Sequence, residues 1–153
     1  MSPSAAQSSY TIKEAAALTG LPASTLRYYE SIGVIPPISR GASSKHRVYD
    51  EEDLDQLMWV ACLAATGMSV SDMRTYVSNG RLGPAAAGEQ IDLLVEQERR
   101  LAREAEQVAL RQRYVRLKIE YWQAVQAGDD DRSELISTQA RALADRLRDA
   151  RPA

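Results

Sequence analysis

A regular spacing of apolar residues runs through the second half of the chain. Ten positions from Ile91 to Trp122 follow one another at alternating intervals of three and four residues, and eight of them are apolar. The residues between them are rich in Glu, Arg and Gln. This spacing predicts one long helix with a coiled-coil seam over residues 86–127, roughly 60 Å long at about 1.5 Å per residue.

Such a helix exposes its apolar seam to water unless another surface covers it. The alternative is that the helix folds back on the N-terminal part of its own chain, but that part is too small to cover so long a seam. We therefore expect a homodimer with the two long helices paired. The residues expected at the dimer contact are Ile91, Leu94, Leu101, Val108, Val115, Ile119 and Trp122.

Helix starts in the N-terminal part are marked by short polar residues. Thr11, Asp50 and Ser69 each precede an acidic residue by three positions, which is the spacing of a capping box. The first of these motifs opens a short helix. The other two predict helices over residues 51–66 and 70–78.

A helix-turn-helix is predicted at the start of the chain. The first helix is expected over residues 12–18 and ends at Gly20, and Pro22 suits the first turn of a second helix that runs to about Ser31. Residues 38–49 have a Gly/Ser-rich centre between short apolar arms, which predicts a small β-hairpin, or wing.

These elements predict a mostly α fold, namely a winged helix-turn-helix domain followed by a long dimerisation helix. The expected leader covers residues 1–9, the domain residues 10–80 and a linker residues 81–85. After the long helix, residues 128–153 hold a terminal amphipathic helix that is expected to pack on the dimer or to fray.

Charge is distributed unevenly along the chain. The net charge is −2 overall, yet residues 10–49 hold five bases against two acids, and residues 50–85 hold two bases against six acids. The one basic segment coincides with the predicted helix-turn-helix and wing. A nucleic-acid site is therefore expected there.

The run Leu26-Arg-Tyr-Tyr-Glu30 is the most informative motif. Together with Tyr10-Thr-Ile-Lys-Glu-Ala-Ala, Gly20-Leu-Pro-Ala-Ser-Thr, Gly33-Val-Ile-Pro36 and Arg47-Val-Tyr-Asp50, it resembles the N-terminal domain of the mercury-resistance regulator (MerR) family over residues 10–80. The resemblance implies a dimeric transcription regulator with antiparallel long helices. Such proteins bind a pseudo-palindromic promoter operator, bend and untwist it, and act on RNA polymerase there.

The resemblance also implies which residues contact DNA. Tyr hydroxyls and Arg guanidinium groups are good donors to phosphates and base edges. Core packing is the alternative for both tyrosines of the motif, and we favour it for Tyr29. His46 is expected to be a solvated wing residue or a phosphate contact. The expected DNA-binding residues are Ser24, Thr25, Arg27, Tyr28, Arg40, Lys45, His46, Arg47 and Tyr49.

Cys62 is the only cysteine. The run from Cys62 to Met68, with Lys118-Ile-Glu-Tyr121, resembles the aldehyde- and electrophile-responsive branch of the family, the NmlR/AdhR type, in which one cysteine here is the proposed sensor. A thiol can add to aldehydes or be oxidised reversibly. Free cysteine is also often a small buried hydrophobe, so core packing is the alternative.

Other classes of function have less support. One His and one Cys argue against an enzyme and against a metal site, so no cofactor is expected. No apolar run is long enough to span a membrane, and the N-terminus lacks a signal peptide, so we expect a cytoplasmic protein. A DNA-architectural or excisionase-like protein, or a regulator that senses a non-covalent hydrophobic ligand, stays open as an alternative.

Overall fold

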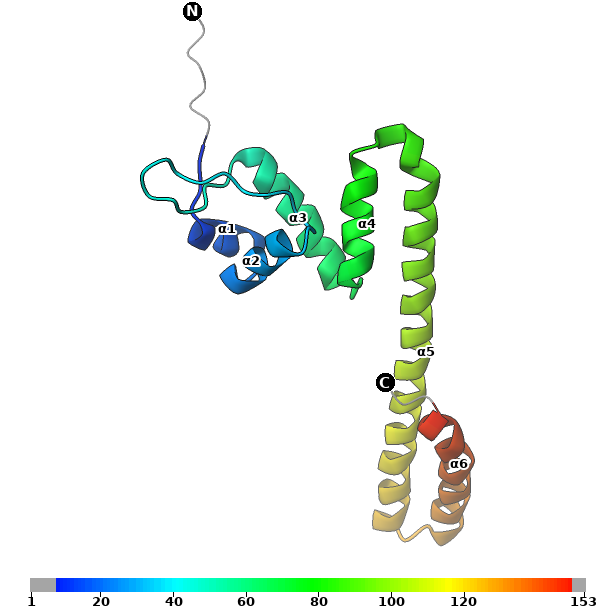
Figure 1. Ribbon diagram of the computed structural model, residues 1–153. Helices are drawn as coiled ribbons and strands as arrows, with labels where there is room; N and C mark the ends of the chain where they lie inside the picture. Colours follow the sequence, from blue (N-terminus) through cyan, green and yellow to red (C-terminus); the bar gives the residue numbers. More distant parts are fainter. Residues whose placement is uncertain (1–7, 150–153) are drawn as a thin grey trace, which may run out of the picture. The chain divides into compact units, whose positions relative to one another are not determined.

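The computed structural model describes residues 8–149 and is almost entirely helical. It divides into two compact units, which meet in sequence between Val95 and Glu96. Within residues 8–149, no helix is long and apolar enough to cross a membrane. The elements (Figure 1) are α1 (Ile12–Thr19), α2 (Ala23–Ser31), α3 (Glu51–Ala65), α4 (Val70–Gly80), the 3₁₀ helix η1 (Gly83–Ala86), α5 (Ala87–Gln126) and α6 (Asp130–Asp149).

The predicted helix ranges agree with the observed ones to within two residues at each end. The capping side chains explain this agreement. The Thr11 hydroxyl accepts a hydrogen bond from the Glu14 backbone N–H at 3.1 Å, and Asp50 Oδ1 accepts one from the Asp53 N–H at 2.8 Å. Each cap satisfies a helix N–H that has no partner within the helix and stabilises it by about 0.5–2 kcal/mol.

The N-terminal unit has one hydrophobic core shared by α1, α2, α3 and α4. Gly20 adopts a left-handed conformation (φ 75°) between α1 and α2, which suits a residue without a Cβ and lets the two helices cross tightly. Because Phe is absent, aliphatic side chains and tyrosine fill the interior. Its most deeply buried large side chains are Tyr49, Leu26, Ile35, Leu57, Met73, Val34 and Val60.

The wing differs from the predicted β-hairpin, because its arms form no extended strands. Among the described residues there are two isolated antiparallel bridges, one between Arg40 and Arg47 and one between Tyr10 and Tyr49. The pairing does not lengthen because Pro37 has no N–H, and the Ile38 N–H donates to Glu30 instead of to a neighbouring strand.

The C-terminal unit is a pair of antiparallel helices (Figure 1). Gly128 (φ 71°) allows the chain to reverse, and Asp129 Oδ1 accepts from the Arg132 N–H at 3.1 Å at the start of α6. The terminal helix therefore packs on α5 of its own chain, where we expected packing on the dimer or fraying. Its contact with α5 buries Leu117, Ala124, Ile136, Ala140 and Leu143.

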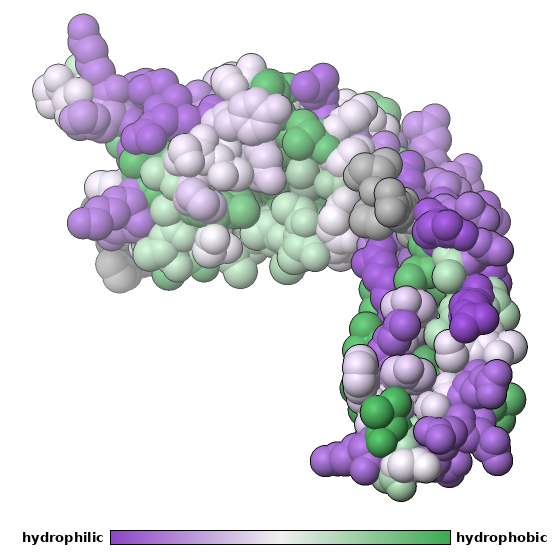
Figure 2. Space-filling view, turned by 90° about the horizontal axis from the view of Figure 1, so that it is seen from below, coloured by the Kyte–Doolittle hydropathy of each residue, from purple (hydrophilic) through white to green (hydrophobic). Residues whose placement is uncertain are grey.

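The face of α5 that lies against α6 is opposite the predicted seam. Leu110, Leu117 and Ala124 follow Val108, Val115 and Trp122 by two residues each, which is about 200° around a helix. The seam stays exposed as a result, with 57% of Val115 and 64% of Trp122 open to solvent. Hydrophobic patches lie among hydrophilic side chains in the right-hand part of Figure 2.

Candidate nucleic-acid interface

Helix α2 separates the residues of the Arg-Tyr-Tyr motif onto two faces. Leu26 and Tyr29 are three positions apart, share one face and are buried in the core. Arg27 and Tyr28 lie on the outer face, where Tyr28 is 52% exposed. The inward packing predicted for Tyr29 is therefore confirmed, and the alternative of core packing for Tyr28 is wrong. Ser24 is also exposed, while Thr25 is half-buried.

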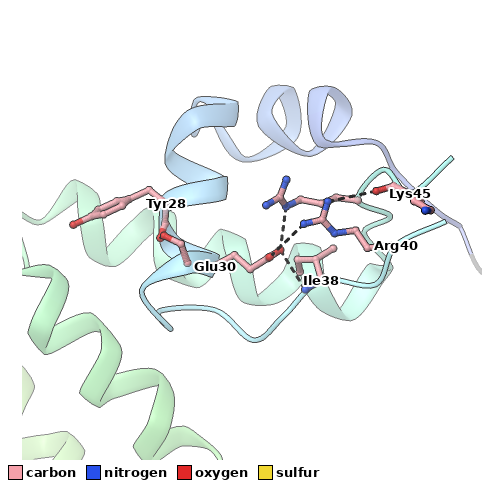
Figure 3. A network of polar contacts seen from close by, with 7 residues as sticks. Tyr28, Glu30, Ile38, Arg40 and Lys45 are labelled. Atoms are coloured by element: carbon pink, nitrogen blue, oxygen red, sulfur yellow. Dashed lines mark hydrogen bonds and ion pairs between the residues drawn. The ribbon is translucent and has the colours of Figure 1, made fainter. Parts of the chain in front are cut away.

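Glu30 connects the end of α2 to the wing (Figure 3). Its Oε1 atom accepts hydrogen bonds from Arg47 Nε at 3.1 Å and from the Ile38 backbone N–H at 3.3 Å. Its Oε2 atom lies 4.0 Å from Arg40 Nη2. Tyr28 projects away from this network, so Tyr28 and Glu30 serve different surfaces although they belong to one motif.

The two arginines of this network differ in how much they offer to a partner. The side chain of Arg47 is only 18% exposed and Glu30 is 14% exposed, so their charge-assisted hydrogen bond is largely shielded from water. Arg40 is 49% exposed and bonds only at long range, from Nη1 to the Lys45 carbonyl at 3.4 Å. Arg40 is therefore the wing arginine with more of its guanidinium group available to a phosphate.

The tip of the wing is a tight turn that presents Lys45 and His46 to solvent. Lys45 adopts a left-handed conformation (φ 57°), and backbone bonds of 2.9 Å join Gly41 to both Lys45 and His46. A Cβ at Gly41 would meet the Ser44 hydroxyl at 2.5 Å, so only glycine fits there without a shift. The turn thus fixes the direction in which a cation and an imidazole leave the backbone.

Tyr49 requires a correction, because it lies in the core and is fully buried. Two backbone hydrogen bonds with Tyr10, of 2.8 and 2.9 Å, hold it beneath the wing. Its hydroxyl makes no hydrogen bond with any described residue. Burial raises the pKa of Tyr49, against the opposing effect of nearby Arg47. A direct contact between Tyr49 and DNA is therefore not available, and its role is to support the wing from below.

The predicted cations thus gather on the N-terminal unit. Arg27 on α2, with Arg40, Lys45 and His46 on the wing, presents exposed nitrogen donors. Lys13 on α1 is exposed as well and was not among the predicted site residues. Glu30 was also missed as an organising residue, although an acid at the end of a basic motif that is followed by two wing arginines was a usable signal.

Cys62 lies on α3 and is exposed, so the alternative that it is a core residue is wrong. Its neighbours on the same surface of the helix are Met58 and Trp59, which are 44% and 64% exposed. Among the described residues, no group of three or more His, Cys, Asp or Glu side chains is arranged to hold a metal ion. The thiol is thus reachable on a partly apolar surface.

Comparison with known proteins matches the same part of the chain. Residues 10–80 fit the family described as MerR HTH family regulatory protein. An HTH-type transcriptional regulator of Haemophilus influenzae is 30% identical over 121 residues, which cover 77% of this chain and 87% of that protein. The regulator AdhR of Bacillus subtilis is 34% identical over 90 residues.

The shared length differs among these proteins. The chain spans 64% of AdhR and 51% of a second Bacillus subtilis regulator, which is 41% identical over 71 residues. Among solved structures, HiNmlR, a MerR family regulator lacking the sensor domain and bound to promoter DNA, superimposes with a TM-score of 0.62 at 26% identity. That match covers 78% of this chain and 94% of HiNmlR.

Proposed function

This chain belongs to the MerR family of helix-turn-helix transcriptional regulators, and from that premise we propose that it binds a promoter operator as a homodimer. The observation that carries the proposal is the outer face of α2, where Arg27 and Tyr28 are exposed in the same unit as the basic wing. A helix of this kind reads base edges in the major groove, while wing cations contact the flanking phosphates. HiNmlR, which shares this fold, was solved on promoter DNA.

The dimer is supported by the unpartnered seam of α5. Leu101, Val108 and Ile119 are 39–46% exposed at seam positions, although a soluble chain gains free energy by burying such side chains. Since α6 lies on the opposite face of α5, it leaves the seam accessible to a second copy. We propose an antiparallel pair, which would present two α2 helices to two half-sites of a pseudo-palindrome.

Such a dimer acts through the shape of the DNA that it binds. We propose that it bends and untwists the operator and thereby changes how RNA polymerase uses the promoter. The exposed thiol of Cys62 supports a covalent input to this switch, because it lies in the same unit as the DNA-binding surface. Addition of the thiol to an aldehyde would form a carbon–sulfur bond and leave the proton on the former carbonyl oxygen.

Footprinting on DNA upstream of the protein's own coding sequence tests the proposal. The expected result is protection of two half-sites about one helical turn apart. Arg27→Ala should weaken that binding by about 1–3 kcal/mol. The matched control is Arg132→Ala, which removes an exposed arginine from α6 and should leave binding unchanged. Equal affinity of both variants for the operator would contradict the assignment of α2.

A further inference from the structure

A groove of about 420 Å³ lies between α3 and α4 in the N-terminal unit. Its floor contains Val60 and Val77, which belong to the core, and Pro36 from the segment after α2 closes one side. This volume falls in the range of small-molecule sites, which are mostly apolar with a few polar groups at fixed positions. The proposed DNA-binding surface makes no use of this groove.

Helical spacing directs a defined set of side chains into the groove. On α3, Glu52, Asp55 and Trp59 are three and four residues apart and so share one face. On α4, Tyr76 and Gly80 are four residues apart and line the opposite wall. Two aromatic rings therefore border an apolar floor, and two carboxylates stand one to two turns before Trp59.

The wall formed by α4 is held in place by the first turns of α5. Gln90 Nε2 donates to the Tyr76 carbonyl oxygen at 2.9 Å, and Asn79 Nδ2 donates to Gln90 Oε1 at 3.3 Å. Asn79 is itself buried. The Tyr76 backbone is therefore fixed from behind, so this wall exists before any ligand arrives.

The charges in the groove favour a cation. No hydrogen bond or ion pair joins the side chain of Glu52 or Asp55 to another residue within 8–149, whereas Glu14, Asp50 and Asp53 cap helices and Glu30 pairs with Arg47. Arg81 adds one positive charge at the end of α4, which leaves the lining with a net charge of −1. Two carboxylates beside a 64% exposed tryptophan favour a ligand that is both positively charged and apolar.

We propose that this groove binds a small aromatic cation, that is, a ring carrying a quaternary or protonated amine. The ring would lie on the floor of Val60 and Val77 between Trp59 and Tyr76, and the ammonium group would face Glu52 and Asp55. A neutral ring of the same shape loses both the ionic and the cation–π attraction. An aromatic anion is repelled by the two carboxylates. The proposal is independent of DNA binding.

Titration calorimetry of the full chain with benzyltrimethylammonium tests the site. The expected result is saturable binding, with the uncharged isostere neopentylbenzene about fivefold or more weaker and with no binding of benzenesulfonate. Equal binding of the isostere would overturn the proposal. Failure of the cation to bind would overturn it as well.

Three variants locate the binding. Asp55→Asn and Trp59→Leu should each weaken the cation about threefold to fivefold, while Glu134→Gln on α6, an exposed control, should have no effect. Gly80→Leu should abolish binding, since a Cβ there meets nothing within 4 Å and a leucine side chain would enter open space. Leucine also favours a helix over glycine, so the fold is retained. Unchanged binding by Gly80→Leu would place the cation elsewhere.

Discussion

The Oε1 atom of Glu30 accepts a 3.1 Å hydrogen bond from Arg47 Nε, and this bond joins the end of α2 to the far arm of the wing. The same carboxylate also holds the Ile38 N–H, at the near arm. One side chain thus connects both arms of the wing to the helix. Since the arms form no extended strands, the carboxylate takes over part of the role that a sheet ladder would have.

Glu30→Gln separates positioning from charge. Removal of an acid beside DNA should strengthen binding if only long-range electrostatics mattered. We expect the reverse, a loss of operator affinity, because the amide cannot hold both arginines and the wing loses its fixed orientation. Unfolding in urea should show about 1 kcal/mol lower stability, as a charge-assisted hydrogen bond becomes a neutral one. Tighter binding by Glu30→Gln would contradict the positioning role.

Arg40→Ala and Arg47→Ala form a matched pair, because each removes one wing arginine. Arg40 is half exposed, so its loss should reduce the slope of log K against log salt by about one at unchanged stability. Arg47 is mostly shielded by Glu30, so its loss should lower stability in urea as well as affinity. Titrations at four salt concentrations, together with unfolding curves, measure both effects. Identical behaviour of the two variants would show that the pairing with Glu30 does not distinguish them.

The helices were predictable from sequence because their signals are local. Caps such as Thr11 and Asp50 act within one turn, and the period of the seam is contained in α5 itself. The different exposure of Tyr28 and Tyr29 is local as well, because neighbouring positions of a helix point about 100° apart. Each of these features depends on residues that are close together in the sequence: within a few positions for the caps and the tyrosines, and at intervals of three and four for the seam.

The features that were missed depend on partners far away in sequence. Tyr49 looks like an exposed aromatic residue at the end of a basic wing, yet its pairing with Tyr10, 39 residues away, places it in the core. The wing arms were read as strands because nothing in residues 38–49 shows that Glu30 captures the Ile38 N–H. The packing of α6 on α5 was not predicted because α5 has a second apolar face, with Leu117 and Ala124, besides the seam.

Lysine substitutions on the seam of α5, compared with one on the exposed surface of α6, test the dimer. The double variant Val108→Lys, Val115→Lys places charges on the exposed seam and should convert a dimer into a monomer in sedimentation. The control is Leu135→Lys on α6, which is also exposed (59%) but lies outside the seam and should leave the dimer intact. A double variant that still sediments as a dimer would exclude the seam as the interface.

Tyr49→Phe removes a buried hydroxyl that has no hydrogen-bond partner among the described residues. We expect stability to rise by about 1 kcal/mol, because the cost of desolvating that hydroxyl disappears. Burial raises the pKa of Tyr49 above 10.0, so the folded state favours the protonated phenol. The native chain should therefore lose stability as the pH rises above about 10, and Tyr49→Phe should lose less. Urea unfolding at pH 8 and pH 10.5 measures both the gain in stability and its dependence on pH. Operator affinity should not change, since the hydroxyl is out of reach of DNA.

Cys62→Ser tests whether the thiol is the sensor, and labelling of the native protein with a thiol reagent comes first. An exposed thiol should react fully with a thiol reagent in the native protein, without unfolding. Serine at an exposed position should change stability by no more than about 0.5 kcal/mol, so fold and operator binding are retained.

If the thiol is the sensor, formaldehyde should alter the footprint or transcription from the promoter with the native chain, and have no effect with Cys62→Ser. The matched control is Ser78→Ala on α4, which leaves the thiol in place and should keep the response. A serine variant that responds to formaldehyde like the native chain would exclude Cys62 as the sensor. A regulator that senses a non-covalent ligand would then be the remaining alternative.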